Sequence, residues 1–142
     1  YTIHYTPYTI HHYTLCGRRP IHYACIHGHL EVSKWLHAQG VKLDVVDHDG
    51  FQPVHHACRK GELEVARWLC EQGAVLDLAD NDGWRPIHYA CAEGHLDVAQ
   101  WLQAQGVALD VEDNDGGRPI THANDNARSE MVKWLEAQGV AL

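Results

Sequence analysis

Residues 17–40 read GRRPIHYACIHGHLEVSKWLHAQG, and this pattern returns three more times along the chain. Its fixed points are a Gly, a Pro, a Trp and a closing Gly, each of which recurs at a spacing of 33 residues. These rows are Gly17, Gly50, Gly83 and Gly116; Pro20, Pro53, Pro86 and Pro119; Trp35, Trp68, Trp101 and Trp134; and Gly40, Gly73, Gly106 and Gly139. The common 33-residue spacing of these four rows predicts an array of four structural units. The units are 17–49, 50–82, 83–115 and 116–142, of which the last is shorter.

Each unit contains start and stop signals for two helices. Pro20 suits the first turn of a helix, where its missing N–H has no partner, and Gly28 can end that helix. The apolar residues that follow recur at roughly helical spacing until Gly40, which can close a second helix in the left-handed conformation. We therefore expect helices near 20–27 and 30–39, and at the equivalent places in the other units.

The segments between the helix pairs contain turn-forming residues. Residues 44–52, DVVDHDGFQ, are rich in Asp and Gly, which favour a tight reversal of the chain. A hairpin-like finger is therefore expected between units. The tryptophan row falls on the apolar face of the second helices, and we expect Trp35, Trp68, Trp101 and Trp134 in the core.

The unit resembles the ankyrin repeat, which combines a β-turn with two helices and has the signature T-P-L-H-x-A. Residues 20–24, 53–57 and 86–90 match this signature from its proline onward. Where the signature has Thr, the chain has Arg19, Gln52, Arg85 and Arg118, so each first helix loses a capping hydroxyl worth about 1 kcal/mol. The resemblance implies a mainly α fold, an ankyrin-type solenoid of helix–turn–helix units with short β-hairpin fingers, in which neighbouring units bury one another's apolar faces.

Two segments depart from the regular units. Residues 1–16 form a Tyr/Thr-rich low-complexity N-terminal segment outside the array of residues 17–142. They cover the first unit, pair with a partner's sheet edge, or form a tail without a role of its own. In the last unit, Asn124 and residues 127–129 replace the regular Cys and Gly-His-Leu. These residues suit an outer capping face, and a degenerate repeat explains them nearly as well.

Composition and charge narrow the function classes. The chain has 142 residues, with 19 acidic and 11 basic side chains and a formal charge of -8. A negative protein repels phosphates, so neither nucleic acid nor an anionic membrane is expected as a partner. No apolar stretch approaches the roughly 18–20 residues that cross a bilayer, so direct membrane insertion is not expected. The five cysteines lack a secreted-disulfide spacing, which indicates an intracellular protein, soluble or bound in a complex.

Repeated histidines and cysteines suggest a metal site as one alternative. The pairs are His22/Cys25, His55/Cys58 and His88/Cys91. A zinc site needs four converging ligands, whereas these pairs are one repeat apart, so we expect structural histidines, buried cysteines and no cofactor. The sequence also contains no phosphate-binding Gly-rich loop and no nucleophile elbow, so we expect no enzymatic activity.

The resemblance also implies where a partner binds, because fingers and first helices form the recognition surface of ankyrin-like proteins. Carried over to this chain, that surface consists of Tyr23, His48, Phe51, His56, Arg59, Lys60, Asn81, Trp84 and Tyr89. Phe51 and Trp84 follow the Gly of a finger, where an exposed aromatic side chain would serve as an interface anchor. The alternative is that both residues pack one finger against the next.

Acidic pairs recur at the expected finger tips, with arginines at the finger bases. The pairs are Asp47/Asp49, Asp80/Asp82 and Asp113/Asp115, and the arginines are Arg19, Arg85 and Arg118. One interpretation is that the aspartates cap tight turns and the arginines neutralise them. The other is an acidic ridge that attracts a partner with a basic surface.

Taken together, these features predict a protein–protein interaction module that serves as an adaptor, a scaffold or a fixed subunit of a larger complex. The module would hold its partner protein on the fingers and first helices. The alternative is that the chain is the ankyrin portion of a longer multi-domain enzyme or channel.

Overall fold

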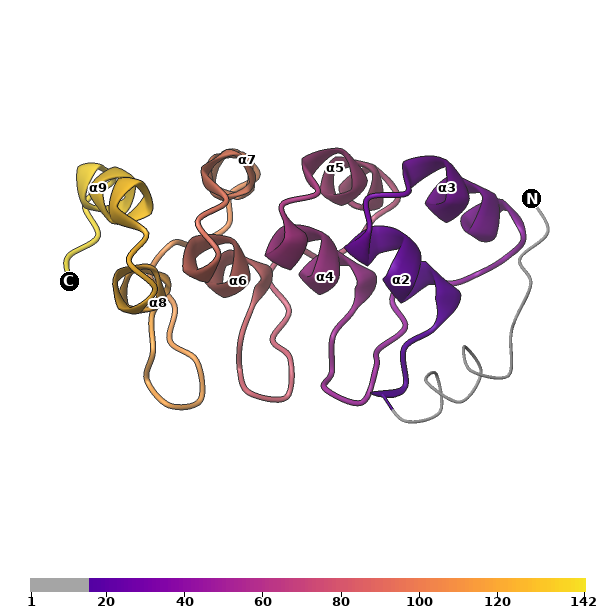
Figure 1. Ribbon diagram of the computed structural model, residues 1–142, viewed down its shortest axis with the longest axis horizontal. Helices are drawn as coiled ribbons and strands as arrows, with labels where there is room; N and C mark the ends of the chain where they lie inside the picture. Colours follow the sequence, from indigo (N-terminus) through magenta and orange to yellow (C-terminus); the bar gives the residue numbers. More distant parts are fainter. Residues whose placement is uncertain (1–15) are drawn as a thin grey trace.

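The computed structural model describes residues 16–142 as two rows of short helices with loops that project from one side (Figure 1). The first helices of the units are α2 (Pro20–Ile26), α4 (Pro53–Lys60), α6 (Pro86–Ala92) and α8 (Pro119–Asp125). The second helices are α3 (Leu30–Ala38), α5 (Leu63–Glu71), α7 (Leu96–Ala104) and α9 (Ser129–Ala137). The expected helix pairs are confirmed, and the proposals made for the N-terminal segment concern residues 1–15, which lie outside the described residues.

Each first helix begins at its proline, as the sequence predicts. The residue before the proline, Arg19 in the first unit, forms no side-chain cap. His22 compensates in part, because its Nδ1 accepts the backbone N–H of Arg19 at 2.9 Å and so satisfies a group that the helix leaves unpaired. The same bond joins Gln52 to His55 at 3.0 Å and Arg85 to His88 at 2.9 Å.

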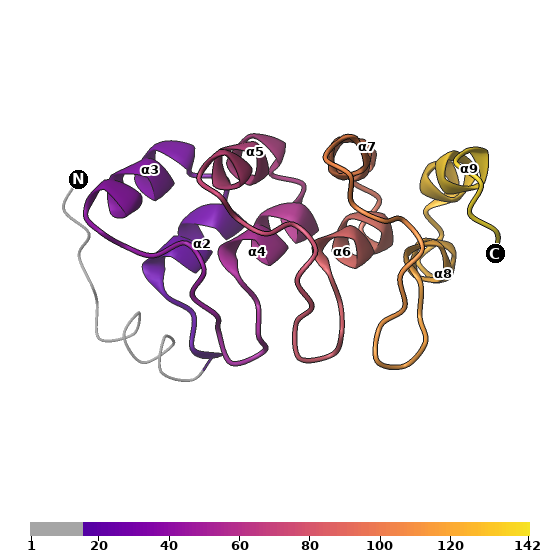
Figure 2. The same cartoon turned by 180° about the vertical axis from the view of Figure 1, so that it is seen from behind.

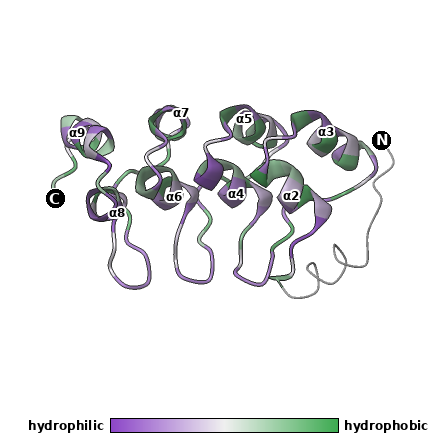
Figure 3. Ribbon diagram, in the orientation of Figure 1, coloured by the Kyte–Doolittle hydropathy of each residue, from purple (hydrophilic) through white to green (hydrophobic). Residues whose placement is uncertain are grey.

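The units stack mainly through their first helices. Helix α4 packs between α2 and α6, and α6 packs between α4 and α8, whereas contacts between neighbouring second helices are sparse. Small buried side chains allow this close approach, and they form the row Ala24, Ala57, Ala90 and Ala123. Hydrophobic residues gather on the helices, while the finger tips are hydrophilic (Figure 3). None of the described helices is both long and apolar enough to cross a membrane.

The tryptophan row lies at the edge of the core rather than inside it. Trp68 is buried, with 8% of its surface exposed. Trp35, Trp101 and Trp134 are half-buried and pack against the core cluster. The expectation of a core position is therefore confirmed for Trp68 and holds only in part for the other three.

The last unit keeps the core positions but is polar on its outer side. Ile120 and Leu135 are fully buried like their counterparts in the other units. Asn124 and Ser129 are exposed, whereas Cys91 and Leu96 at the equivalent places of the third unit are buried and half-buried. This exposed polar face is compatible with the capping interpretation.

The fingers are tight loops that lie side by side below the first helices, as the view from behind also shows (Figure 2). The first finger is closed by two backbone bonds. The N–H of Asp47 donates to the carbonyl of Phe51 at 3.1 Å, and the N–H of Gly50 donates to the carbonyl of Asp47 at 3.0 Å. Among residues 16–142 these loops form no β-strand, so the hairpins implied by the resemblance are turns without a β-ladder.

A left-handed residue joins the two helices of each unit. Gly28, Gly61 and Gly94 have φ angles of 68°, 73° and 75°. In the last unit Ala127 takes this place with a φ of 57°, and it is the one non-glycine residue with positive φ in the described part of the chain. Since a Cβ disfavours this conformation by about 1–2 kcal/mol, Ala127 is a strained position.

We predict that Ala127→Gly stabilises the array by about 0.5–1 kcal/mol, because relief of strain exceeds the extra chain entropy of glycine. Urea unfolding followed by circular dichroism measures the change. The matched control is Ala104→Gly at the end of α7, where glycine should be neutral or destabilising. A loss of stability in Ala127→Gly that equals or exceeds that of the control would contradict the prediction.

Candidate partner-binding site

The residues expected at the recognition surface differ widely in exposure. His48, Lys60 and Asn81 are exposed. Tyr23, Arg59, Trp84 and Tyr89 are half-buried. Phe51 and His56 are buried, with 7% and 1% of their surfaces exposed. The expectation that Phe51 and His56 present their side chains to a partner is therefore wrong, because both are enclosed by neighbouring aromatic rings.

An aromatic row connects three units and explains this burial. The ring of Phe51 lies 4.8 Å from that of His56 and 5.2 Å from that of Tyr89, both edge-on. Trp84 lies 4.8 Å from Tyr89 and 4.0 Å from the ring of His122. Phe51 and Trp84 thus pack each finger base onto the next first helix, and only Trp84 keeps part of its ring in solvent.

A buried aspartate organises each finger. Oδ1 of Asp47 accepts the backbone N–H groups of Asp49 at 3.0 Å and Phe51 at 2.9 Å. Oδ2 of Asp47 accepts a hydrogen bond from Nε2 of His56 at 2.9 Å, and Arg18 Nε lies 3.6 Å from the same oxygen. A short polar side chain fixes a turn when it accepts hydrogen bonds from backbone N–H groups two and four residues later in the chain. The first finger therefore has a single well-defined shape.

The same arrangement recurs in the other two fingers. Asp80 accepts the backbone N–H groups of Asp82 and Trp84 and the hydroxyl of Tyr89. Asp113 accepts those of Asp115 and Gly117 and the Nε2 proton of His122 at 2.7 Å. The sequence interpretation missed this pairing of a finger aspartate with the side chain nine residues later, although the spacing is visible in all three units.

These contacts set the charge states of the buried groups. Burial would raise the pKa of Asp47, but hydrogen bonds from Phe51 and His56 hold it below its ordinary value, so the group stays a carboxylate. Burial lowers the pKa of His56 to about 4, so His56 is neutral and donates its Nε2 proton to Asp47. Burial and the bond to Asp80 both raise the pKa of Tyr89.

Only half of the expected acidic ridge faces solvent. Asp47, Asp80 and Asp113 have 4–8% of their surfaces exposed and act as turn caps. Asp49, Asp82 and Asp115 are exposed at the finger tips. The expectation that both aspartates of each pair line the tips is therefore wrong. The first aspartate of each pair is buried and accepts the backbone hydrogen bonds that close the turn.

The arginines at the finger bases do not neutralise the tips. Arg118 instead donates to Asp110 at 2.8 Å and to the carbonyl of Ala141 at 2.8 Å. Arg19 and Arg85 form no ion pair with a tip aspartate among residues 16–142. The tip carboxylates of the described fingers thus remain available to a partner.

The finger tips hold one another through backbone and amide bonds. Asn81 donates its backbone N–H to the carbonyl of Asp49 at 3.1 Å and its side-chain amide to the carbonyl of His48 at 2.9 Å. Asn114 binds Asp82 and Asn81 in the same way, both at 3.1 Å. His48 donates its backbone N–H to the carbonyl of Cys16 at 3.0 Å. His48 and Asn81, expected only as recognition residues, therefore also fix the spacing of the fingers.

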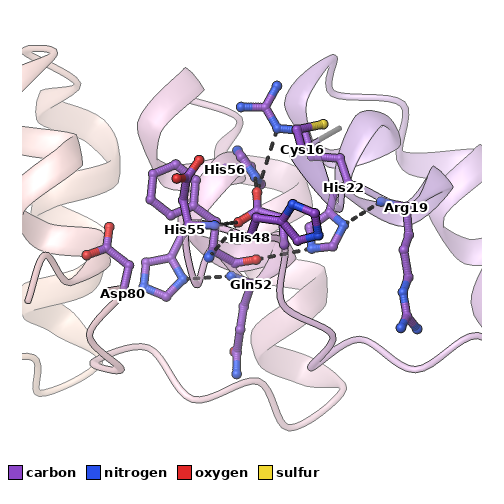
Figure 4. Close-up of polar contacts among 12 residues, drawn as sticks. Cys16, Arg19, His22, His48, Gln52, His55, His56 and Asp80 are labelled. Atoms are coloured by element: carbon purple, nitrogen blue, oxygen red, sulfur yellow. Dashed lines mark hydrogen bonds and ion pairs between the residues drawn. The ribbon is translucent and has the colours of Figure 1, made fainter. Parts of the chain in front are cut away.

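The signature histidines are bound at both ring nitrogens, and Figure 4 shows His22 beside Arg19 and His55 beside Gln52. Nδ1 of His22 accepts from the backbone of Arg19, so Nε2 must be the donor, to the carbonyls of Val45 at 3.0 Å and Phe51 at 3.1 Å. His55 and His88 donate in the same way to the carbonyls of Leu78 at 2.7 Å and Val111 at 2.9 Å. Burial lowers the pKa of all three rings, which keeps them neutral.

Packing also accounts for the cysteines of the repeated His-Cys pairs. Cys25, Cys58 and Cys91 are free, fully buried thiols, and burial raises the pKa of each to about 12. Within residues 16–142, no group of three or more His, Cys, Asp or Glu side chains is placed to hold a metal ion. The repeated pairs are therefore explained by the fold.

We predict that acid destabilises the array in the pH window of the buried histidines. Because His56 has a pKa near 6.5 when unfolded and about 4 when folded, protonation favours the unfolded chain. The stability contributed by neutral His56 is present above about pH 6.5 and is lost as the pH falls towards about 4. Urea unfolding across this window measures the loss.

His56→Tyr should reduce this pH dependence while keeping the fold, since Tyr89 occupies the equivalent place and binds Asp80. His27→Gln, which removes an exposed imidazole, is the matched control and should leave the dependence unchanged. Equal pH dependence of wild type and His56→Tyr would overturn the prediction.

Comparison with known protein families agrees with this architecture. The family model described as ankyrin repeats (3 copies) matches residues 3–80 and 73–141. No curated protein matches the chain. Ankyrin repeats are generally protein–protein interaction modules. With the matches spanning nearly the whole sequence, and with paired helices, fingers and signature histidines in place, the chain belongs to the ankyrin-repeat family.

Proposed function

We propose that the chain binds a partner protein across its finger–helix surface and serves as an adaptor or as a fixed subunit of a larger assembly. The finger–helix surface is defined here by the exposed or half-buried residues Tyr23, His48, Asp49, Arg59, Lys60, Asn81, Asp82, Trp84, Tyr89 and Asp115. The general role of ankyrin repeats as interaction modules supports this assignment. The proposal gives these residues a binding role and includes no catalytic step.

The observation that carries the proposal is that the units differ from one another at the position that Lys60 occupies on this surface. One exposed position lies at the end of the first helix or directly after it, and its side chain differs in every unit. The four residues are His27, Lys60, Glu93 and Asn126. At an exposed position in the first turn of the second helix, all units have an acid: Glu31, Glu64, Asp97 and Glu130. A position that changes from unit to unit is not fixed by the stacking common to all units. Glu93 lies 3.8 Å from Arg128, and Asn126 donates to the carbonyl of His122 at 2.8 Å. Lys60 forms no ion pair among residues 16–142 and is available for recognition.

The rigidity of the surface also supports binding. The fingers are held by buried aspartates, and their tips are held by the Asn81 and Asn114 bonds. Binding to a surface whose backbone is already ordered loses less conformational entropy than binding to a mobile loop. The fixed fingers therefore present exposed Asp49 and Asp82 at defined positions.

We predict that the triple variant Asp49→Lys, Lys60→Glu, Asp82→Lys loses the natural partner, because each change reverses an exposed charge on the finger–helix surface. The matched control is Glu64→Lys, Arg67→Glu, Glu71→Lys, which reverses three exposed charges on α5 with the same net change. Affinity capture from native extract, quantified by mass spectrometry, compares both variants with wild type.

The expected result is a protein that wild type and the α5 variant retain and the finger variant loses. Circular dichroism of each variant checks that folding is unchanged. Retention of the same protein by the finger variant, together with its loss from the α5 variant, would place the contact on the second helices and contradict the proposal.

A further inference from the structure

We propose that Arg59 is a receptor for a carboxylate, and that the partner segment seated on the finger–helix surface carries an Asp or Glu flanked by Lys or Arg. This inference rests on the proposed function and names the chemistry that the surface selects. It starts from the position of one cation at the end of α4.

Two aromatic rings hold the Arg59 side chain in place. Its guanidinium carbon lies 5.9 Å from the centre of the Phe51 ring and 5.8 Å from the centre of the Tyr89 ring. Both rings are themselves fixed, because Phe51 is buried and the hydroxyl of Tyr89 binds Asp80. The cation–π contacts therefore restrict a side chain that is usually mobile at a surface.

The guanidinium has no anion of its own within residues 16–142. Arg59 forms no ion pair there, and neither does its exposed neighbour Lys60. Stacking does not require a cation at this position, because the equivalent residues in the other units are Ile26, Ala92 and Asp125. Arg59 is thus a half-buried cation that the fold does not use for pairing.

The contact with the rings decides which ligand fits. The ring contacts attract the charge of the guanidinium, and none of its N–H groups donates a hydrogen bond within residues 16–142, so these groups can bind a carboxylate through two parallel hydrogen bonds. Since Arg59 is half-buried, such a pair is screened less than one in open water. A fixed, planar donor beside Lys60 is therefore suited to an Asp or Glu side chain.

The surrounding charge decides the flanking residues. Asp49 and Asp82 are exposed at the neighbouring finger tips and form no ion pair within residues 16–142. A segment with acidic residues throughout would be repelled by these carboxylates, and so would a doubly charged phosphate. In a segment with a single Asp or Glu between basic residues, the acidic side chain pairs with Arg59, and the tip aspartates attract its basic neighbours.

The test selects a phage-displayed library of random short peptides on the full chain. The matched pair of variants is Arg59→Gln and Arg67→Gln, the second removing an exposed arginine on α5. We expect wild type and Arg67→Gln to select peptides in which one acidic residue is flanked by basic residues. We expect Arg59→Gln to lose the preference for the acidic residue while retaining the basic ones.

A synthetic peptide with the selected sequence then measures the interaction between its acidic residue and Arg59. Changing its acidic residue to the amide should weaken binding to wild type by about tenfold and should not change binding to Arg59→Gln. Arg59→Lys should restore only part of the affinity, because an ammonium cannot form the two parallel bonds. Unfolding midpoints of the variants show whether the fold is intact.

Two results overturn the inference, and they are distinguishable from failure of the proposed function. The inference fails if the wild-type peptides lack an acidic residue, or if Arg59→Gln keeps the same acidic preference. In either case the proposed function still holds when the peptides lose binding to the triple variant at Asp49, Lys60 and Asp82. Peptides that bind this triple variant as tightly as wild type would contradict both.

Discussion

A neutral imidazole bridge is the interaction on which the array depends. In His22, His55 and His88, one ring nitrogen accepts the backbone N–H that precedes a first helix, and the other donates to carbonyls of the finger that follows. Only the neutral ring with its proton on Nε2 satisfies both ends. One side chain thus caps a helix and fixes the position of the adjoining finger.

A buried carboxylate provides the second polar link between neighbouring units. Asp47 closes its finger through two backbone N–H groups and binds His56 on the next first helix. Each unit is therefore joined to the next by polar contacts as well as by apolar burial. Because buried donors and acceptors that lose their partners are costly, these contacts specify one spacing between units and one finger shape. The surface that the fingers present is consequently rigid, which suits recognition of a partner.

Local signals made the helix pairs predictable from sequence. Pro20 and Gly28 act through their own backbone preferences, so their effect does not depend on distant residues. The periodic spacing then indicated the stacked array. The small buried thiols such as Cys58 were also predictable, because each occupies the same repeated place as its counterparts.

The candidate site was harder to predict because its exposure depends on residues from other units. Phe51 looks exposed when its own unit is considered, but the ring of Tyr89 from the next unit lies 5.2 Å away and helps to enclose it. The sequence shows two similar aspartates in each finger and does not show that Asp47 is used by the turn while Asp49 stays free. Which side chains remain available to a partner is thus decided by the contact between units.

The most direct test of this account is the protonation state of the bridging histidines. Two-bond ¹H–¹⁵N correlation spectra of the folded chain at about pH 6.5, where a free imidazole is half protonated, distinguish the two neutral tautomers from imidazolium. The account predicts that His22, His55 and His88 are all neutral with the proton on Nε2. Observation of imidazolium or of the Nδ1–H tautomer at these positions would contradict the bridge and the array geometry derived from it.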